Sequence, residues 1–137
     1  MEAMFDHVLA AVEAVRVPLG PWRRRLSALL IHAIETLSGH GGLARVGLTS
    51  VPTGPHAQVI TERVRGLLAE AGLSEPSIAA GLDLLGLFAS AAALDRVALS
   101  APAVVRRRRL RWEVEVIISG LLETPAPAGG RPTAAGR

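Results

Sequence analysis

The stretch RRRRLRWEVEVIISGLLE, residues 106–123, can be interpreted as a β-strand or as a helix, and this choice decides the fold class. Polar and apolar residues alternate strictly over residues 110–116, as in a half-buried strand. A longer pattern gives helical spacing to Leu110, Val114, Ile117, Ile118 and Leu121. An isolated strand among helices would have no partner and would not be stable. The sequence therefore predicts a helix over residues 103–123.

Five arginines crowd the N-terminal end of this helix, at residues 106–109 and at Arg111. The helix macrodipole disfavours cations there, so the cluster is either a solvated helix end or a phosphate-binding patch. We favour the solvated end, because no aromatic platform or second basic cluster accompanies it. Any DNA binding by this cluster is expected to be weak and independent of sequence. Four-residue spacing also predicts ion pairs from Arg109 to Glu113 and from Arg111 to Glu115.

The composition favours helices throughout. The chain has 137 residues, enough for one ordinary domain, and 50% of them are hydrophobic while only 3% are aromatic. Most of the hydrophobic residues are alanine, leucine, valine or isoleucine, a composition that suits close-packed helices better than a β-sandwich. The sequence predicts an all-α fold.

The charge balance gives little support to nucleic-acid binding. All 15 basic residues are arginine, which is typical of a GC-rich coding sequence, and the net charge is only +3. The chain has no cysteine, which excludes a disulfide framework and thiolate metal sites and fits a cytoplasmic protein.

Proline and glycine divide the chain into six helical segments, expected near residues 2–17, 22–37, 43–49, 55–71, 75–100 and 103–123. Thr53 is a candidate N-cap, Gly72 a candidate C-cap and Ser74 a second candidate N-cap. Residues 1–123 are expected to form one domain. Residues 124–137 are rich in proline, glycine and alanine and are expected to be a disordered tail.

The most hydrophobic window covers residues 78–94 and contains one acid, Asp83. It is shorter than the ~20 apolar residues of a membrane span, so a buried helix is expected and no membrane partner. A helix that is apolar on every side must be covered on every side. In so small a protein, a partner subunit is a natural source of the missing cover.

Catalytic and metal-binding patterns are missing from the sequence. His7, His32, His40 and His56 show no metal-ligand spacing, and GHGG lacks the strand and the lysine of a phosphate loop. No serine lies in a nucleophile elbow. We therefore expect no enzyme, no metal and no cofactor. His32 is expected to be a structural or ligand-contacting histidine.

The order of segments resembles the C-terminal regulatory domain of the tetracycline-repressor (TetR) family. The landmarks are the Trp-led helix that begins in PWRRRL, the GLAR helix, the PTGP turn, the helix ending LLAEAGL, the hydrophobic helix and the closing RWEVEVIISGLLE. The resemblance spans roughly residues 5–123. It implies about six helices, with the last two long ones forming a four-helix bundle across a homodimer. It also implies a small-molecule pocket, and DNA binding only through a helix-turn-helix domain that residues 1–137 do not include.

On this basis we expect a ligand-binding and dimerisation domain of a transcriptional regulator. Its effector is expected to be a small hydrophobic or amphipathic molecule. The candidate pocket residues are His32, Thr49, Ile60, Val64, Leu85 and Phe88. The candidate dimer-interface residues are Leu87, Ala91, Leu94, Val114, Ile117, Ile118 and Leu121. Two alternatives remain open: a ligand-free helical interaction module, and a nonspecific arginine-driven nucleic-acid binder.

Overall fold

The computed structural model describes residues 2–14, 18–48, 53–98 and 100–127. These residues form six helices and no strand: α1 (Glu2–Ala14), α2 (Trp22–Ser38), α3 (Gly41–Gly47), α4 (Pro55–Glu70), α5 (Glu75–Ala98) and α6 (Ala103–Glu123). The predictions of an all-α fold and of a helix at residues 103–123 are confirmed. Thr49 and most of the predicted tail, residues 128–137, lie outside the described residues.

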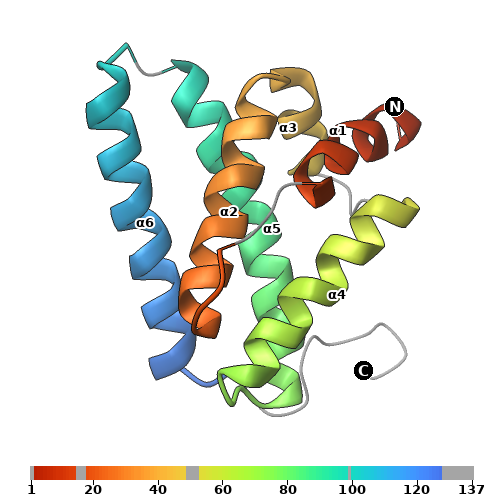
Figure 1. Cartoon of the computed structure of the whole chain (residues 1–137), viewed down its shortest axis with the longest axis vertical. Helices are drawn as coiled ribbons and strands as arrows, with labels where there is room; N and C mark the ends of the chain where they lie inside the picture. Colours follow the sequence, from red (N-terminus) through yellow and green to blue (C-terminus); the bar gives the residue numbers. More distant parts are fainter. Residues whose placement is uncertain (1, 15–17, 49–52, 99, 128–137) are drawn as a thin grey trace.

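Helix α5 runs through the centre of the fold (Figure 1). It contacts α2, α3, α4 and α6, with α4 on one side and α6 on the other. Residues 75–96 are long and apolar enough to cross a membrane by length and composition alone. Four helices of the same chain pack against this segment, and Ile78, Leu85, Ala89, Ala92 and Ala93 on it are buried in the core.

All six helices contribute side chains to the hydrophobic core. The largest fully buried side chains are Val12 in α1, Leu26 and Ile34 in α2, Leu68 in α4, Ile78 in α5, and Leu110, Val114 and Ile118 in α6. On α6 the buried residues recur every four positions, which is the helical stripe found in the sequence. That stripe therefore faces the chain's own interior.

The turn between α4 and α5 follows the predicted capping pattern. Gly72 has φ +87°, a left-handed conformation that suits glycine after a helix, and the N–H of Leu73 donates to the carbonyl of Leu68 at 3.2 Å. The side-chain oxygen of Ser74 accepts a hydrogen bond from the N–H of Ser77 at 3.4 Å. The predicted N-cap Ser74 is confirmed, whereas the C-cap of α4 is Ala71 and Gly72 is the residue that follows it.

The start of α4 is capped differently from the prediction. Its N-cap is Gly54, not Thr53, and no side chain at that position caps the helix. Instead Asp6 of α1 accepts hydrogen bonds from the N–H groups of His56 and Ala57, at 3.0 and 3.1 Å. A Cβ atom at residue 54 would overlap the Asp6 carboxylate, so only glycine allows this approach. The prediction failed because the capping residue lies 50 residues away in sequence.

A second polar contact joins α1 to α4. Nδ1 of His56 pairs with the carboxylate of Glu13, and Arg63 donates to the backbone carbonyl of Glu13 at 3.0 Å. The hydrogen bond with Glu13 raises the pKa of His56 above its ordinary 6.5, outweighing the lowering effect of burial, and the charges of Glu13 and Asp6 add to the rise. The contact is therefore an ion pair only where His56 is protonated.

This pair makes stability depend on pH. Because the pKa of His56 is raised in the folded state, its stabilisation is fully present below about 6.5 and is lost as pH rises through the folded-state value. We expect Glu13→Gln to lower the urea midpoint more at pH 6.0 than at pH 8.5. His56→Asn, as the control, should remove this difference between the two pH values. An equal effect of Glu13→Gln at both pH values would contradict the assignment.

Candidate ligand-binding site

The predicted pocket residues divide between two regions. Val64 and Leu85 are buried in the core, and Ile60 and Phe88 are partly buried and pack against it. These four side chains come from α4 and α5, two helices that contact each other. His32 instead lines a groove between α2 and α6.

This α2–α6 groove has a volume of about 650 Å³. Pro18, which precedes α2, lines it together with residues of both helices: Arg24, Ser27, Ala28, Ile31, His32 and Glu35 from α2, and Arg107, Arg111 and Glu115 from α6. The α6 residues recur every four positions, so they form one wall along that helix. The groove was not predicted from the sequence, although this spacing of charged residues on α6 was a usable signal.

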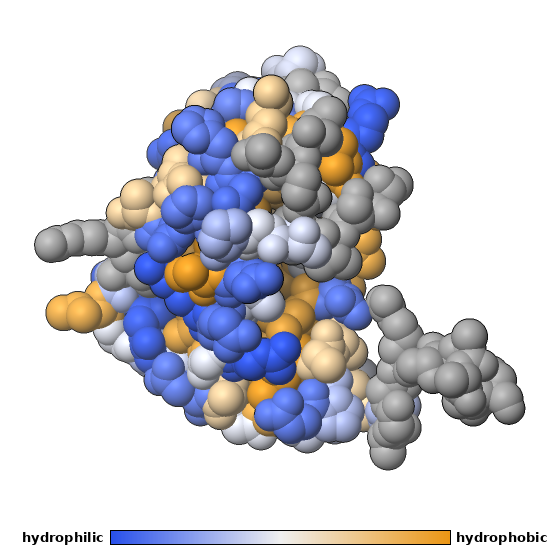
Figure 2. Space-filling model, turned by 90° about the vertical axis from the view of Figure 1, so that its right-hand side faces the viewer, coloured by the Kyte–Doolittle hydropathy of each residue, from blue (hydrophilic) through white to orange (hydrophobic). Residues whose placement is uncertain are grey.

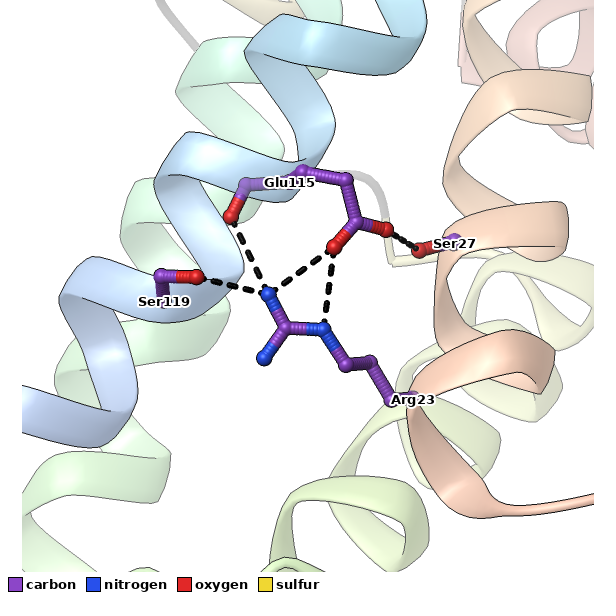
Figure 3. A network of polar contacts seen from close by, with 4 residues as sticks. All are labelled: Arg23, Ser27, Glu115 and Ser119. Atoms are coloured by element: carbon purple, nitrogen blue, oxygen red, sulfur yellow. Dashed lines mark hydrogen bonds and ion pairs between the residues drawn. The ribbon is translucent and has the colours of Figure 1, made fainter.

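One end of the groove is held by a polar network around Glu115 (Figure 3). Arg23 Nε donates to Oε2 of Glu115 at 2.9 Å, and its Nη2 donates to Oγ of Ser119 at 2.6 Å. Ser27 donates to the other oxygen of Glu115 at 2.9 Å. Both carboxylate oxygens of Glu115 are therefore occupied by partners on α2.

The other end is held by Glu35 of α2. Its Oε2 lies 3.7 Å from Arg96 of α5 and 3.8 Å from Arg107 of α6, so one carboxylate serves two arginines. The Arg96 side chain is only 16% exposed, and its Nε and Nη1 are buried without a hydrogen-bond partner. An incompletely paired guanidinium therefore lies beside the groove.

Two further arginines line the groove between these ends. Arg24 and Arg111 are exposed, and neither has an ion-pair partner within the described residues. The predicted pair of Arg109 with Glu113 is confirmed, at 3.4 Å. The predicted pair of Arg111 with Glu115 is wrong, because Glu115 binds Arg23 of α2 instead.

The predicted interface residues do not share one environment. Leu87 is 48% exposed and Ala91 is also exposed, whereas Leu94, Ile117 and Leu121 are partly buried against the core. Val114 and Ile118 are 0% and 1% exposed, so they are core residues of this chain and are not available to a partner. The spacing that selected them marks the inner face of α6.

Other apolar side chains of α5 and α6 are exposed and were missed. They are Leu84 on α5 at 45%, and Trp112 and Val116 on α6 at 65% and 50%. Trp112 and Val116 were part of the strand-like alternation, and their four-residue spacing was the signal for an outer helical stripe.

Metal chemistry finds no support in the described part of the chain. Among these residues, no group of three or more histidine, aspartate or glutamate side chains could hold a metal ion. The groove is lined by arginines and also by the apolar residues Pro18, Ala28 and Ile31.

Solved structures share this fold. ActR from Streptomyces coelicolor, a TetR family protein, superposes with a TM-score of 0.74 and 29% identity in its complex with (S)-DNPA, over 89% of this chain and 73% of that chain. Its complex with actinorhodin gives 0.73 and 28%, over 89% and 74%. A putative transcriptional regulator from Streptomyces coelicolor A3(2) has a TM-score of 0.76 at 19% identity, over 92% and 75%, which shows the fold alone. No curated protein matches the chain.

The family model for the tetracyclin repressor-like C-terminal domain matches residues 17–124. This match covers α2 to α6 and includes the groove and the exposed stripes of α5 and α6. The chain therefore belongs to the TetR family of transcriptional regulators, and the matched part is the effector-sensing C-terminal domain.

Proposed function

We propose that this chain forms a homodimer through α5 and α6 and binds a small hydrophobic or amphipathic effector in its interior. It acts by binding and not by catalysis, in the cytoplasm. Sequence-specific contact with DNA is left to a helix-turn-helix domain, as in the rest of the family. The observation that carries the dimer proposal is the exposed apolar surface of the last two helices.

This surface is concentrated on two neighbouring helices. Of the eleven large hydrophobic side chains exposed in the described residues, seven lie on α5 or α6: Leu84, Leu87, Val104, Val105, Trp112, Val116 and Leu122. Exposed apolar side chains that gather on adjacent elements indicate a protein contact, whereas scattered ones do not. A second copy with the same stripes would cover them in a two-fold arrangement.

The stripe on α6 is separate from the core. At 100° per residue, Trp112 and Val114 point in nearly opposite directions, and the same holds for Val114 and Val116. Val114 is fully buried, so Trp112 and Val116 point outward. This helix is therefore apolar on two opposite faces, and the rest of the chain covers only one of them.

The face formed by α1 and α4 has a different character. Hydrophilic residues dominate it, with hydrophobic ones scattered among them (Figure 2). Val59 on α4 is 39% exposed. This contrast supports α5 and α6 as the interface and makes α4 a source of control variants.

For the effector we propose the interior region around Ile60, Val64, Leu85 and Phe88, on α4 and α5. Ile60 and Phe88 border the core without being fully buried, so a ligand between them requires little loss of packing. ActR was solved with two small organic ligands, (S)-DNPA and actinorhodin, which supports a comparable role here. An aliphatic and aromatic lining suits an effector with a hydrophobic framework.

The interior site is tested with N-phenyl-1-naphthylamine, a neutral fluorescent probe. Ile60→Glu should weaken its binding about tenfold or more, because a carboxylate in an apolar site must be desolvated. Val59→Glu, the adjacent and exposed position, should leave the affinity unchanged. Failure of the wild-type protein to bind the probe, or equal affinity in the two variants, would contradict the site and favour a ligand-free interaction module.

The dimer is tested by light scattering coupled to gel filtration. The wild-type protein should show twice the 14.3 kDa mass of the chain at micromolar concentration. Leu87→Glu and Val116→Glu should each raise the dissociation constant roughly hundredfold or more, because each buries an unpaired charge twice in the interface. Val59→Glu should remain dimeric. A monomeric mass for the wild-type protein would contradict the proposal, and so would a dimeric mass for all three variants.

A further inference from the structure

The α2–α6 groove carries more positive charge than its own ion pairs use. Glu115 is neutralised by Arg23, and Glu35 is shared by Arg96 and Arg107. The groove lining contains three arginines (Arg24, Arg107 and Arg111) and two glutamates, an excess of one positive charge. Arg23 and Arg96 pair with the two glutamates from outside this lining, which leaves Arg24 and Arg111 without an ion-pair partner among the described residues.

Charge and apolar surface occur side by side in the groove. Ala28 and Ile31 of α2 and the Pro18 ring line it, while Arg24 and Arg111 come from its two opposite helices. Arginine binds carboxylates and sulfonates through paired N–H donors, and its cost of desolvation is lower than that of an ammonium group. The apolar lining offers a surface for the body of the same ligand.

From these features we propose that the α2–α6 groove binds an amphipathic organic anion, with one carboxylate or sulfonate group on an apolar, ring-containing body. The anionic group is held by Arg24 and Arg111, and the body lies over Ala28 and Ile31. A volume of about 650 Å³ matches a small organic molecule. This site is distinct from the proposed interior site, and the inference rests on the groove's own residues and not on the regulatory role.

The carboxylates of the groove do not oppose such a ligand. Both oxygens of Glu115 already accept hydrogen bonds from α2 (Figure 3), and Glu35 lies between two arginines. Repulsion from these two groups is therefore largely compensated. Because Arg24 and Arg111 are exposed, salt screens their attraction, and the affinity should fall as ionic strength rises.

The test compares two probes that differ by one anionic group, 8-anilinonaphthalene-1-sulfonate and N-phenyl-1-naphthylamine. Arg24→Ala and Arg111→Ala should each weaken sulfonate binding about tenfold, the loss of roughly one charge-assisted hydrogen bond. Arg45→Ala on α3 removes the same charge away from the groove and should leave the affinity unchanged. The neutral probe should bind all four proteins equally. Neither groove arginine has an ion-pair partner in the described part, so their replacement should not disturb folding.

Amide chemical shifts locate the probe. The sulfonate should perturb residues 24–35 and 107–115, and Arg24→Ala/Arg111→Ala should abolish these changes. Equal sulfonate affinity in the wild-type protein and the double variant would overturn the inference. Perturbations confined to α4 and α5 would also overturn it, while leaving the proposed interior effector site intact.

Discussion

The arrangement of the fold depends on the need to cover α5 on every side. This helix is apolar around its circumference, and α2, α3, α4 and α6 pack against it. Two large side chains, Leu84 and Leu87, remain about half exposed after the chain has folded. The packing of the other helices around α5 therefore leaves an apolar stripe of this helix exposed to solvent. A second copy of the chain supplies the missing cover in the account proposed here.

Helix α6 explains both the success and the error of sequence-based prediction. Its longer hydrophobic period correctly predicted a helix, because Leu110, Val114 and Ile118 recur every four residues and face the core. The alternation at Trp112 and Val116 reflects a second stripe on the opposite side and not a strand. Periodicity shows that a face is apolar, but it does not say whether that face meets the chain's own core or a partner. For this reason the same pattern placed Val114 and Ile118 in the predicted interface, whereas both are buried in the core of the folded chain.

The spacing of Arg107, Arg111 and Glu115 marks one wall of the groove, but the partners of these residues could not be predicted because the contacts join residues far apart in sequence. Arg23 and Glu115 are 92 residues apart, and Asp6 caps a helix 50 residues away. Local rules instead paired Glu115 with Arg111 and assigned the cap to Thr53. The N-cap at Ser74 and the left-handed glycine at Gly72, next to the C-cap Ala71, depend on neighbouring residues alone and follow from local rules. In the proposed dimer, a ligand between α2 and α6 would contact the helix whose outer face lies against the second copy, so α6 would belong to both the groove and the interface.

The most direct test of this account is an isotope-filtered NOE experiment on a mixture of labelled and unlabelled protein. Only contacts between the two copies give signals in such a sample. The account predicts intermolecular NOEs from the Leu87 methyl groups and from the Trp112 ring and Val116 methyl groups. Intermolecular NOEs from Val59 on α4 would contradict the claim that the apolar stripes of α5 and α6 form the dimer. The absence of intermolecular NOEs from α5 and α6 would contradict it as well.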